Sequence, residues 1–185
     1  MYGKIPEGYQ QFAPALYNIE QQNEQAVTEM YNTLLKDTPD IAKASIISHL
    51  GDYPSRQTLM TSIQMLKAKK ADTCRAALLS LEAFPAEHTM AYIFPLLTDP
   101  VKIVRLEAAR IVSAIGKDNM SEKHQEILEQ AIEEYRQSLL FAADRPETQL
   151  ALAQLYSNEA KPRLSKWPYF IVIILLFFGF HLKNS

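Results

Sequence analysis

Residues 97–116 read Leu-Thr-Asp-Pro-Val-Lys-Ile-Val-Arg-Leu-Glu-Ala-Ala-Arg-Ile-Val-Ser-Ala-Ile-Gly. The stretch opens with a polar turn that contains a proline, and from Val101 its apolar residues recur at helical spacing as far as Ile115. Gly116 directly follows the last apolar residue, in the position where a glycine commonly ends a helix. The pattern therefore predicts the second helix of a helical hairpin.

The same arrangement occurs three times along the chain. Leu35, Leu66 and Leu97 each end a predicted first helix, and successive leucines lie 31 residues apart. A fixed period of this length is typical of stacked repeats, because one hairpin cannot bury both of its faces alone. We therefore expect an all-α fold, a short α-solenoid of antiparallel helix hairpins. The predicted helix pairs are 24–35 with 40–50, 55–68 with 71–84, and 87–97 with 101–115.

Residues 97–116 resemble a HEAT-type repeat, whose turn carries Asp-Pro and whose second helix opens with Val-Arg and two alanines. The resemblance implies a polar ladder between repeats, to which Asp99 in the turn and Arg105 in the helix would belong. Asp37 and Lys43 would be the weaker counterpart in the first repeat, and Arg75 holds the basic position in the second. The turn of the second repeat departs from the family pattern, since it lacks Asp-Pro.

Two more helices are predicted after the three hairpins. Residues 122–140 have the apolar spacing of a long amphipathic helix. Further on, Leu152, Ala153 and Tyr156 resemble the Leu-small-x-x-Tyr spacing of the first helix of a tetratricopeptide repeat, with Gln149 at the family's aromatic position. The chain would then consist of a lead-in over 1–23, three HEAT-like hairpins over 24–118, a capping helix with a partial tetratricopeptide-like helix over 119–160, and an apolar tail over 161–185.

The order of these segments is similar to the carboxy-terminal part of certain bacterial multihaem c-type cytochrome proteins. Phe12-Ala-Pro-Ala-Leu before the first hairpin and Ala143-Asp-Arg-Pro-Glu near the end both fit, and the similarity covers residues 10 to about 157. In that family a haem-bearing portion comes first, and the repeats lie outside the cytoplasm. Cys74 is the only cysteine, so the chain has no Cys-x-x-Cys-His motif and resembles the repeat portion alone. No cofactor is expected.

The tail contains the most apolar run of the chain. Residues 167–182 read Trp-Pro-Tyr-Phe-Ile-Val-Ile-Ile-Leu-Leu-Phe-Phe-Gly-Phe-His-Leu, and as a helix these 16 residues span roughly 24 Å, against a hydrocarbon core of about 30 Å. Three interpretations stay open: a membrane anchor, an apolar helix docked on the repeat body, and a gene truncated or fused in this region. The anchor residues would be Lys166, Trp167, Tyr169, Phe170, Ile171, Leu175, Phe178 and Lys183. Because the amino terminus lacks the apolar core of a secretory signal, we expect a cytoplasmic chain, membrane-associated if the tail is an anchor.

The residues that could carry chemistry do not form a recognisable catalytic or metal-binding set. The histidines, at 49, 88, 124 and 181, lack metal-ligand spacing, and we expect His49 to be a partly buried packing residue. Cys74 occupies a helix position where small apolar residues pack, although the adjacent Arg75 would lower its pKa if the two groups faced each other. Glu133 and Glu134 belong to a charged, solvated helix face. No metal site and no catalytic residue is therefore expected.

Composition and charge narrow the class of partner. The chain has 185 residues, of which 48% are apolar and 22% charged, so it can form a core, and its 5 glycines disfavour phosphate-binding loops. A formal net charge of −2 does not favour nucleic acid, and the one basic cluster, Lys67, Lys69 and Lys70, lacks interleaved aromatic residues.

Our first hypothesis is a non-enzymatic scaffold that binds a protein partner along the concave surface of the second helices, over 43–49, 75–82 and 105–113. The alternatives are an accessory or truncated repeat portion of a multihaem cytochrome-type redox protein, and a HEAT-like enzyme or cofactor-binding module.

Overall fold

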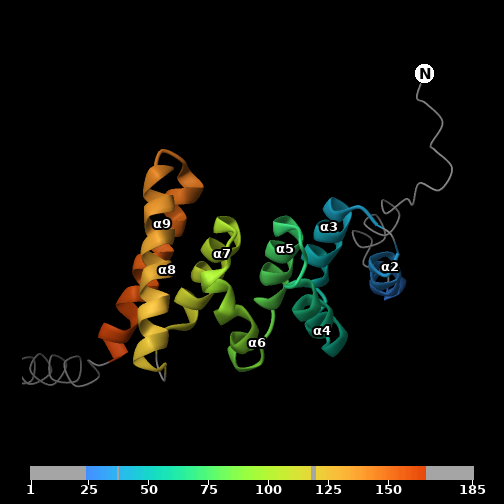
Figure 1. The fold of residues 1–185 in the computed structure, drawn as a ribbon, viewed down its shortest axis with the longest axis horizontal. Helices are drawn as coiled ribbons and strands as arrows, with labels where there is room; N and C mark the ends of the chain where they lie inside the picture. The colour runs from blue at the N-terminus through green and yellow to red at the C-terminus, as the bar shows by residue number, and fades with distance from the viewer. Residues whose placement is uncertain (1–23, 37, 118–119, 166–185) are drawn as a thin grey trace, which may run out of the picture. The chain divides into compact units, whose positions relative to one another are not determined.

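The computed structural model describes residues 24–36, 38–117 and 120–165, with side chains described from 26 to 160 within these ranges. All regular elements in this part of the chain are helical, which confirms the predicted all-α class (Figure 1). They are α2 (Glu24–Leu34), α3 (Asp40–Leu50), α4 (Arg56–Met65), α5 (Ala71–Leu81), α6 (Ala86–Ile93), the 3-10 helix η1 (Phe94–Thr98), α7 (Lys102–Ile115), α8 (Glu122–Phe141) and α9 (Pro146–Ser165).

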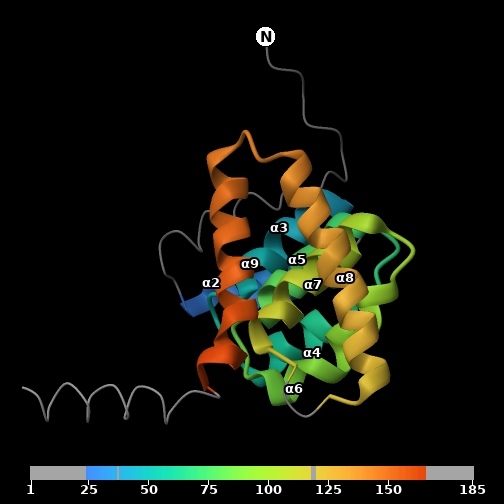
Figure 2. The same cartoon turned by 90° about the vertical axis from the view of Figure 1, so that its left-hand side faces the viewer.

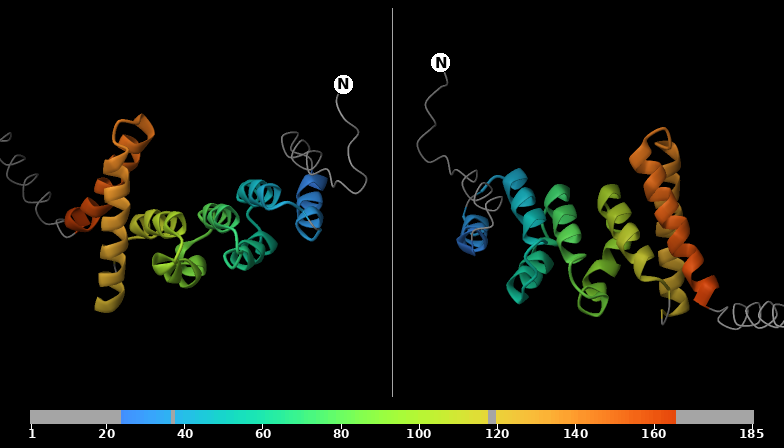
Figure 3. Two further views of the ribbon diagram at one scale, coloured as in Figure 1. Left: turned by 45° about the horizontal axis from the view of Figure 1, so that its top comes forward. Right: turned by 180° about the vertical axis from the view of Figure 1, so that it is seen from behind.

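The chain divides into two compact units, and the boundary between Ala108 and Ala109 falls inside α7. In the first unit α5 is the central helix: it packs against α3 on one side and α4 on another, while α2 packs on α3 (Figures 1 and 3). The second helices of the first two predicted hairpins, α3 and α5, are therefore in direct contact.

Gly51, at the end of α3, is required by this close packing. It is the C-cap residue of α3, with an ordinary helical φ of −59°. A Cβ at this position would lie 3.2 Å from the Cα of Ser80 in α5, closer than normal van der Waals contact. Gly116 does have a left-handed φ of 94°, as expected for a glycine that ends a helix.

The 31-residue period of the sequence is also the period of burial. Ala42, Thr73 and Val104 lie 31 residues apart at one position of α3, α5 and α7, and all three are buried. The same holds at three further positions of these helices: Ile46, Ala77 and Ala108; Ile47, Leu78 and Ala109; Leu50, Leu81 and Val112.

All three predicted first helices end earlier than expected, α2 at Leu34, α4 at Met65 and α6 at Ile93. Leu66 and Leu97 are buried, but Leu35 is 86% exposed, because α2 ends one residue earlier and Leu34 takes the buried position. The helix predicted over 87–97 is interrupted: α6 stops at Ile93 and η1 follows, since Pro95 has no amide hydrogen with which to continue the α-helical bonding.

The second unit contains the helical hairpin α8–α9 (Figure 2). Leu128, Ile132 and Tyr135 of α8 and Leu152 and Leu155 of α9 are buried. α9 begins at Pro146, where proline is well tolerated, and continues through Pro162 to Ser165, further than the predicted partial tetratricopeptide-like helix.

Several predictions fall outside the described residues. They concern the lead-in over 1–23, Asp37 and the tail residues Lys166, Trp167, Tyr169, Phe170, Ile171, Leu175, Phe178 and Lys183. Within 24–36, 38–117 and 120–165, none of the helices has the length and apolarity to cross a bilayer.

Candidate functional site

The exposed side of α3, α5 and α7 in the first unit follows the same period as the buried side. Ile41, Asp72 and Ile103 lie 31 residues apart, each the second residue of its helix, and all three are exposed. Ser48 and Leu79 form a second exposed row at the same spacing. We call the surface formed by Ile41, Ser48, Asp72, Arg75, Leu79 and Ile103 the second-helix face.

Arg75 on this face holds a carboxylate that is almost fully buried. Its Nε donates a hydrogen bond of 2.8 Å to Oε2 of Glu107, which is only 8% exposed, so the pair joins α5 to α7 within the first unit. A buried carboxylate requires such a charged donor, because an unpaired charge in this position would be costly. The sequence analysis did not predict a role for Glu107, although an acidic residue on the apolar side of an amphipathic helix indicates a buried charged contact.

Asp99 and Arg105, the predicted ladder residues of the third repeat, lie in the same turn. Nη1 of Arg105 donates to the backbone oxygens of Asp99 (2.8 Å) and Pro100 (3.1 Å), and the Asp99 carboxylate accepts from the amide of Val101 (2.8 Å). These bonds stabilise the entry into α7. Lys43 lies half-buried on α3. The ladder between repeats stays a prediction.

Hydroxyl groups connect the helices of the first two hairpins in a way that sequence patterns did not indicate. Oη of Tyr31 in α2 lies 2.7 Å from Oγ1 of the fully buried Thr58 in α4, and Thr58 donates in turn to the carbonyl of Tyr53 at 2.8 Å. Between α4 and α5, the buried hydroxyls of Ser62 and Ser80 lie 2.9 Å apart. These polar pairs hold helices together.

The single cysteine is a structural residue. Cys74 is 3% exposed, and its Sγ donates to the backbone oxygen of Leu66 at 3.3 Å. Burial, with a smaller contribution from the negative charge of Asp99, raises the pKa of Cys74 to about 11. The adjacent Arg75 is paired with Glu107, and the expected lowering of the Cys74 pKa does not occur. At neutral pH the thiol is protonated and a poor nucleophile.

We expect a thiol reagent at pH 8 to label Cys74 far more slowly in the folded chain than in urea. The pKa is raised from 9.0 to about 11, so the stability that the protonated thiol contributes is complete below pH 9 and is lost as the pH rises toward 11. Urea unfolding at a series of pH values checks this, with Cys74→Ala as the control that lacks this part of the pH dependence. Equal labelling rates in the folded and unfolded chain would contradict the buried position.

The histidines and lysines that the structure describes form no concentrated site. His49 is exposed, with its Nδ1 3.9 Å from the Asp52 carboxylate, so the prediction of a partly buried packing residue was wrong. Among the described residues no group of histidine, cysteine, aspartate and glutamate has the arrangement of a metal site. Lys67, Lys69 and Lys70 are exposed at the turn between α4 and α5.

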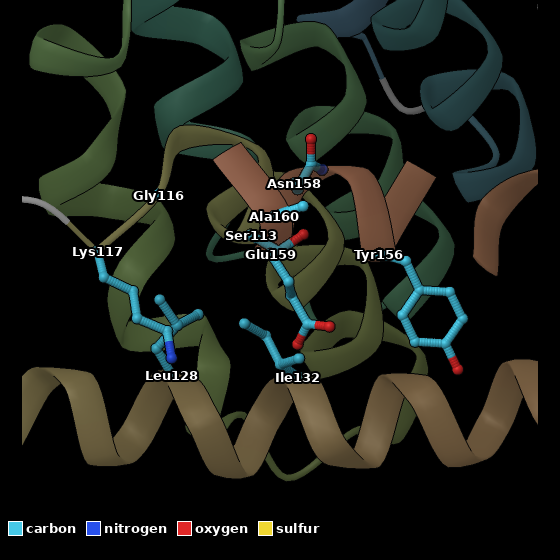
Figure 4. A pocket seen from close by; sticks show the side chains of 9 residues that line it. All are labelled: Ser113, Gly116, Lys117, Leu128, Ile132, Tyr156, Asn158, Glu159 and Ala160. Carbon is cyan, nitrogen blue, oxygen red and sulfur yellow. The ribbon is translucent and has the colours of Figure 1, made fainter. Parts of the chain in front are cut away.

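The second unit contains a cleft of about 540 Å³ (Figure 4). Leu128 and Ile132 extend into it from α8, and Lys117 and Glu159 lie at its edge (Figure 4). The complete lining is Ser113, Gly116, Lys117, Leu128, Ile132, Tyr156, Asn158, Glu159 and Ala160.

The charged groups around this cleft are paired with one another. Nζ of Lys117 donates to Oε1 of Glu129 at 2.7 Å, and this hydrogen bond lowers the pKa of Glu129. Arg136 bonds both Glu133 and Glu159, joining α8 to α9. A hydrogen bond from Gln137 is the main cause of the lowered pKa of Glu133. Glu129 and Glu133 are therefore ionised at neutral pH, which makes both unsuitable as general acids.

Comparison with known proteins gives no match: no protein-family model, no curated protein and no solved structure is similar to this chain. The HEAT, tetratricopeptide and cytochrome resemblances therefore stay predictions from its residues, and a function has to be inferred from its own surfaces.

Proposed function

We propose that this chain is a non-enzymatic helical-repeat module that binds a protein partner through the second-helix face. The observation that carries the proposal is the exposure of equivalent repeat positions. The 31-residue period places Ile41 and Ile103 at the same exposed position of α3 and α7, and Leu79 adds a third large aliphatic side chain on α5. Exposed aliphatic residues at a repeated position form a regular surface rather than a scatter of single residues.

The chemistry of this face suits a protein partner. Its aliphatic side chains are accompanied by Asp72 and Arg75, a mixture of apolar contacts and charged groups that is typical of protein interfaces. The close packing of α3 on α5 fixes the part of the face that these two helices form, so that little conformational entropy would be lost there on binding. The same packing supports the inference that the first two hairpins stack as in a short α-solenoid.

The polar contacts that the structure brings together support a scaffold. Arg75 with Glu107, Tyr31 with Thr58, and Ser62 with Ser80 each connect two helices, which stabilises the arrangement that presents the face.

The test is a triple variant in which Ile41, Leu79 and Ile103 become alanine. We expect binding of the partner to weaken at least about tenfold, since burying a large aliphatic side chain contributes about 1.5–3 kcal/mol. The urea midpoint should stay nearly unchanged, because all three side chains are exposed. Native affinity capture, followed by titration of the captured protein, measures this.

The matched control is Met60→Ala, which removes an equally exposed apolar side chain from α4, outside the face. Met60→Ala should bind like the unaltered chain. The proposal fails if the triple variant captures the same partner with the same affinity, or if Met60→Ala weakens binding as much.

A further inference from the structure

One flank of α9 remains uncovered next to the cleft of the second unit. Ala153 and Ala160 are exposed, and Tyr156 between them is 50% exposed. Spacings of three and four residues place these side chains on one side of α9, next to the side that buries Leu152 and Leu155. Tyr156 and Ala160 also line the cleft, so flank and cleft form one continuous surface.

This surface suits an apolar occupant. The large apolar side chains of the cleft are Leu128, Ile132 and Tyr156 (Figure 4), of which Tyr156 is half exposed while Leu128 and Ile132 are almost fully buried. The charges at its edge are already satisfied, since Lys117 bonds Glu129 and Glu159 bonds Arg136. An ionic ligand would have to disrupt these pairs, whereas apolar side chains would gain burial without doing so.

The sequence that follows α9 supplies such a segment. Residues 169–180, Tyr-Phe-Ile-Val-Ile-Ile-Leu-Leu-Phe-Phe-Gly-Phe, contain no charged side chain. Only Lys166, Trp167 and Pro168 separate them from the end of α9 at Ser165. Pro168 disfavours a helical conformation at Trp167, and a connection of this length is common between antiparallel helices.

The segment is long enough to reach the uncovered flank from the end of α9. Twelve helical residues extend about 18 Å, the same as α9 from position 154 to Ser165. A helix that returned along α9 from Pro168 would therefore cover Tyr156 and Ala160 and lie over the cleft. The small side chain of Ala160 would let the two helix axes approach closely.

We propose that residues 169–180 fold back along α9 as an antiparallel helix and cover Tyr156 and Ala160 together with the cleft. This inference is independent of the partner-binding function proposed above.

A disulfide test on the full chain gives the first check. Trp167 is the central residue of the connection, and Ala160 and Ile174 are equally far from it along the chain. In an antiparallel pair of helices these two positions lie opposite each other. Ala160→Cys with Ile174→Cys should therefore form an intramolecular disulfide under mild oxidation. The matched control is Gln154→Cys with Phe180→Cys, two positions that are also equally far from Trp167. This pair should not crosslink, because Gln154 lies on a different side of α9. Cys74 is buried with a raised pKa and should not compete.

Trp167 is the only tryptophan and provides a second readout that does not depend on the register of the crosslink. Without lipid, Ala160→Arg should shift its emission to longer wavelength and make it more accessible to acrylamide, and Gln154→Arg should change neither. Far-UV circular dichroism checks that both variants stay folded.

Three results would overturn the proposal. The first is failure of the 160–174 disulfide together with a Trp167 emission that Ala160→Arg leaves unchanged. The second is a crosslink found only in dimers, which would mean that a second copy covers the flank. The third is an emission that responds to phosphatidylcholine vesicles but not to Ala160→Arg, which would identify the segment as a membrane anchor.

Discussion

Leu78→Ala is expected to lower the free energy of unfolding by about 2–5 kcal/mol, the usual cost of truncating a fully buried leucine. Leu78 is 0% exposed, and its helix, α5, packs against both α3 and α4. The truncation would remove apolar burial and leave a cavity that helices packed on two sides of α5 cannot easily close. Urea unfolding followed by far-UV circular dichroism measures the loss as a shift of the midpoint.

The next residue is the matched control. Leu79→Ala removes the same atoms from the same helix with the same change in helix propensity, but Leu79 is 36% exposed. Its cost should be much smaller, of the order of 0.5 kcal/mol. The difference between the two variants isolates burial. If Leu79→Ala were as destabilising as Leu78→Ala, α5 would have to be rotated relative to the described packing. A small cost at Leu79 would also make its effect on partner binding directly interpretable.

Thr58→Val is expected to cost about 1–3 kcal/mol, because it removes the 2.7 Å contact of the Tyr31 hydroxyl and the donor to the Tyr53 carbonyl. Thr58 donates its hydroxyl hydrogen to the carbonyl of Tyr53, so in their 2.7 Å contact the Tyr31 hydroxyl must be the donor. Valine has a similar shape and can neither accept from Tyr31 nor donate to Tyr53. Urea unfolding again provides the measurement.

Thr61→Val is the control for this substitution, since Thr61 is on the same helix and is only partly buried. It should change stability little. A double-mutant cycle with Tyr31→Phe separates the hydrogen bond from other effects, and the double variant should cost less than the sum of the two single variants. Additive costs would show that Tyr31 and Thr58 are not energetically coupled and would contradict the described contact.

Helix boundaries were predictable where local chemistry determines them. Ser55 caps α4 by accepting from the amide of Thr58 at 3.0 Å, and Gly116 ends α7 in the left-handed conformation that other residues avoid. Pro95 shows the opposite case. The apolar spacing predicted one continuous helix over 87–97. Because Pro95 has no amide hydrogen, α6 ends at Ile93 and the 3-10 helix η1 follows it.

Pair contacts were harder to predict, because periodicity indicates which side of a helix is buried but not what lies opposite. Glu107 is on the predicted buried side of α7, yet its partner Arg75 is 32 residues earlier in the chain, on α5. Gly51 is the C-cap residue of α3, and its missing Cβ also allows the backbone of α5 to approach α3. Neither could be assigned without knowing which helices are neighbours.

The sequence by itself determined the all-helical class and the 31-residue period, because both depend on the spacing of apolar residues along the chain. The same period identified the buried positions of α3, α5 and α7. Only the tertiary structure decided which polar groups meet, as in Tyr31 with Thr58, and where a cleft forms between α8 and α9. The physical reason is that hydrogen bonds and cavities depend on distances of a few ångströms between residues far apart in the chain, and apolar spacing carries no information about those distances.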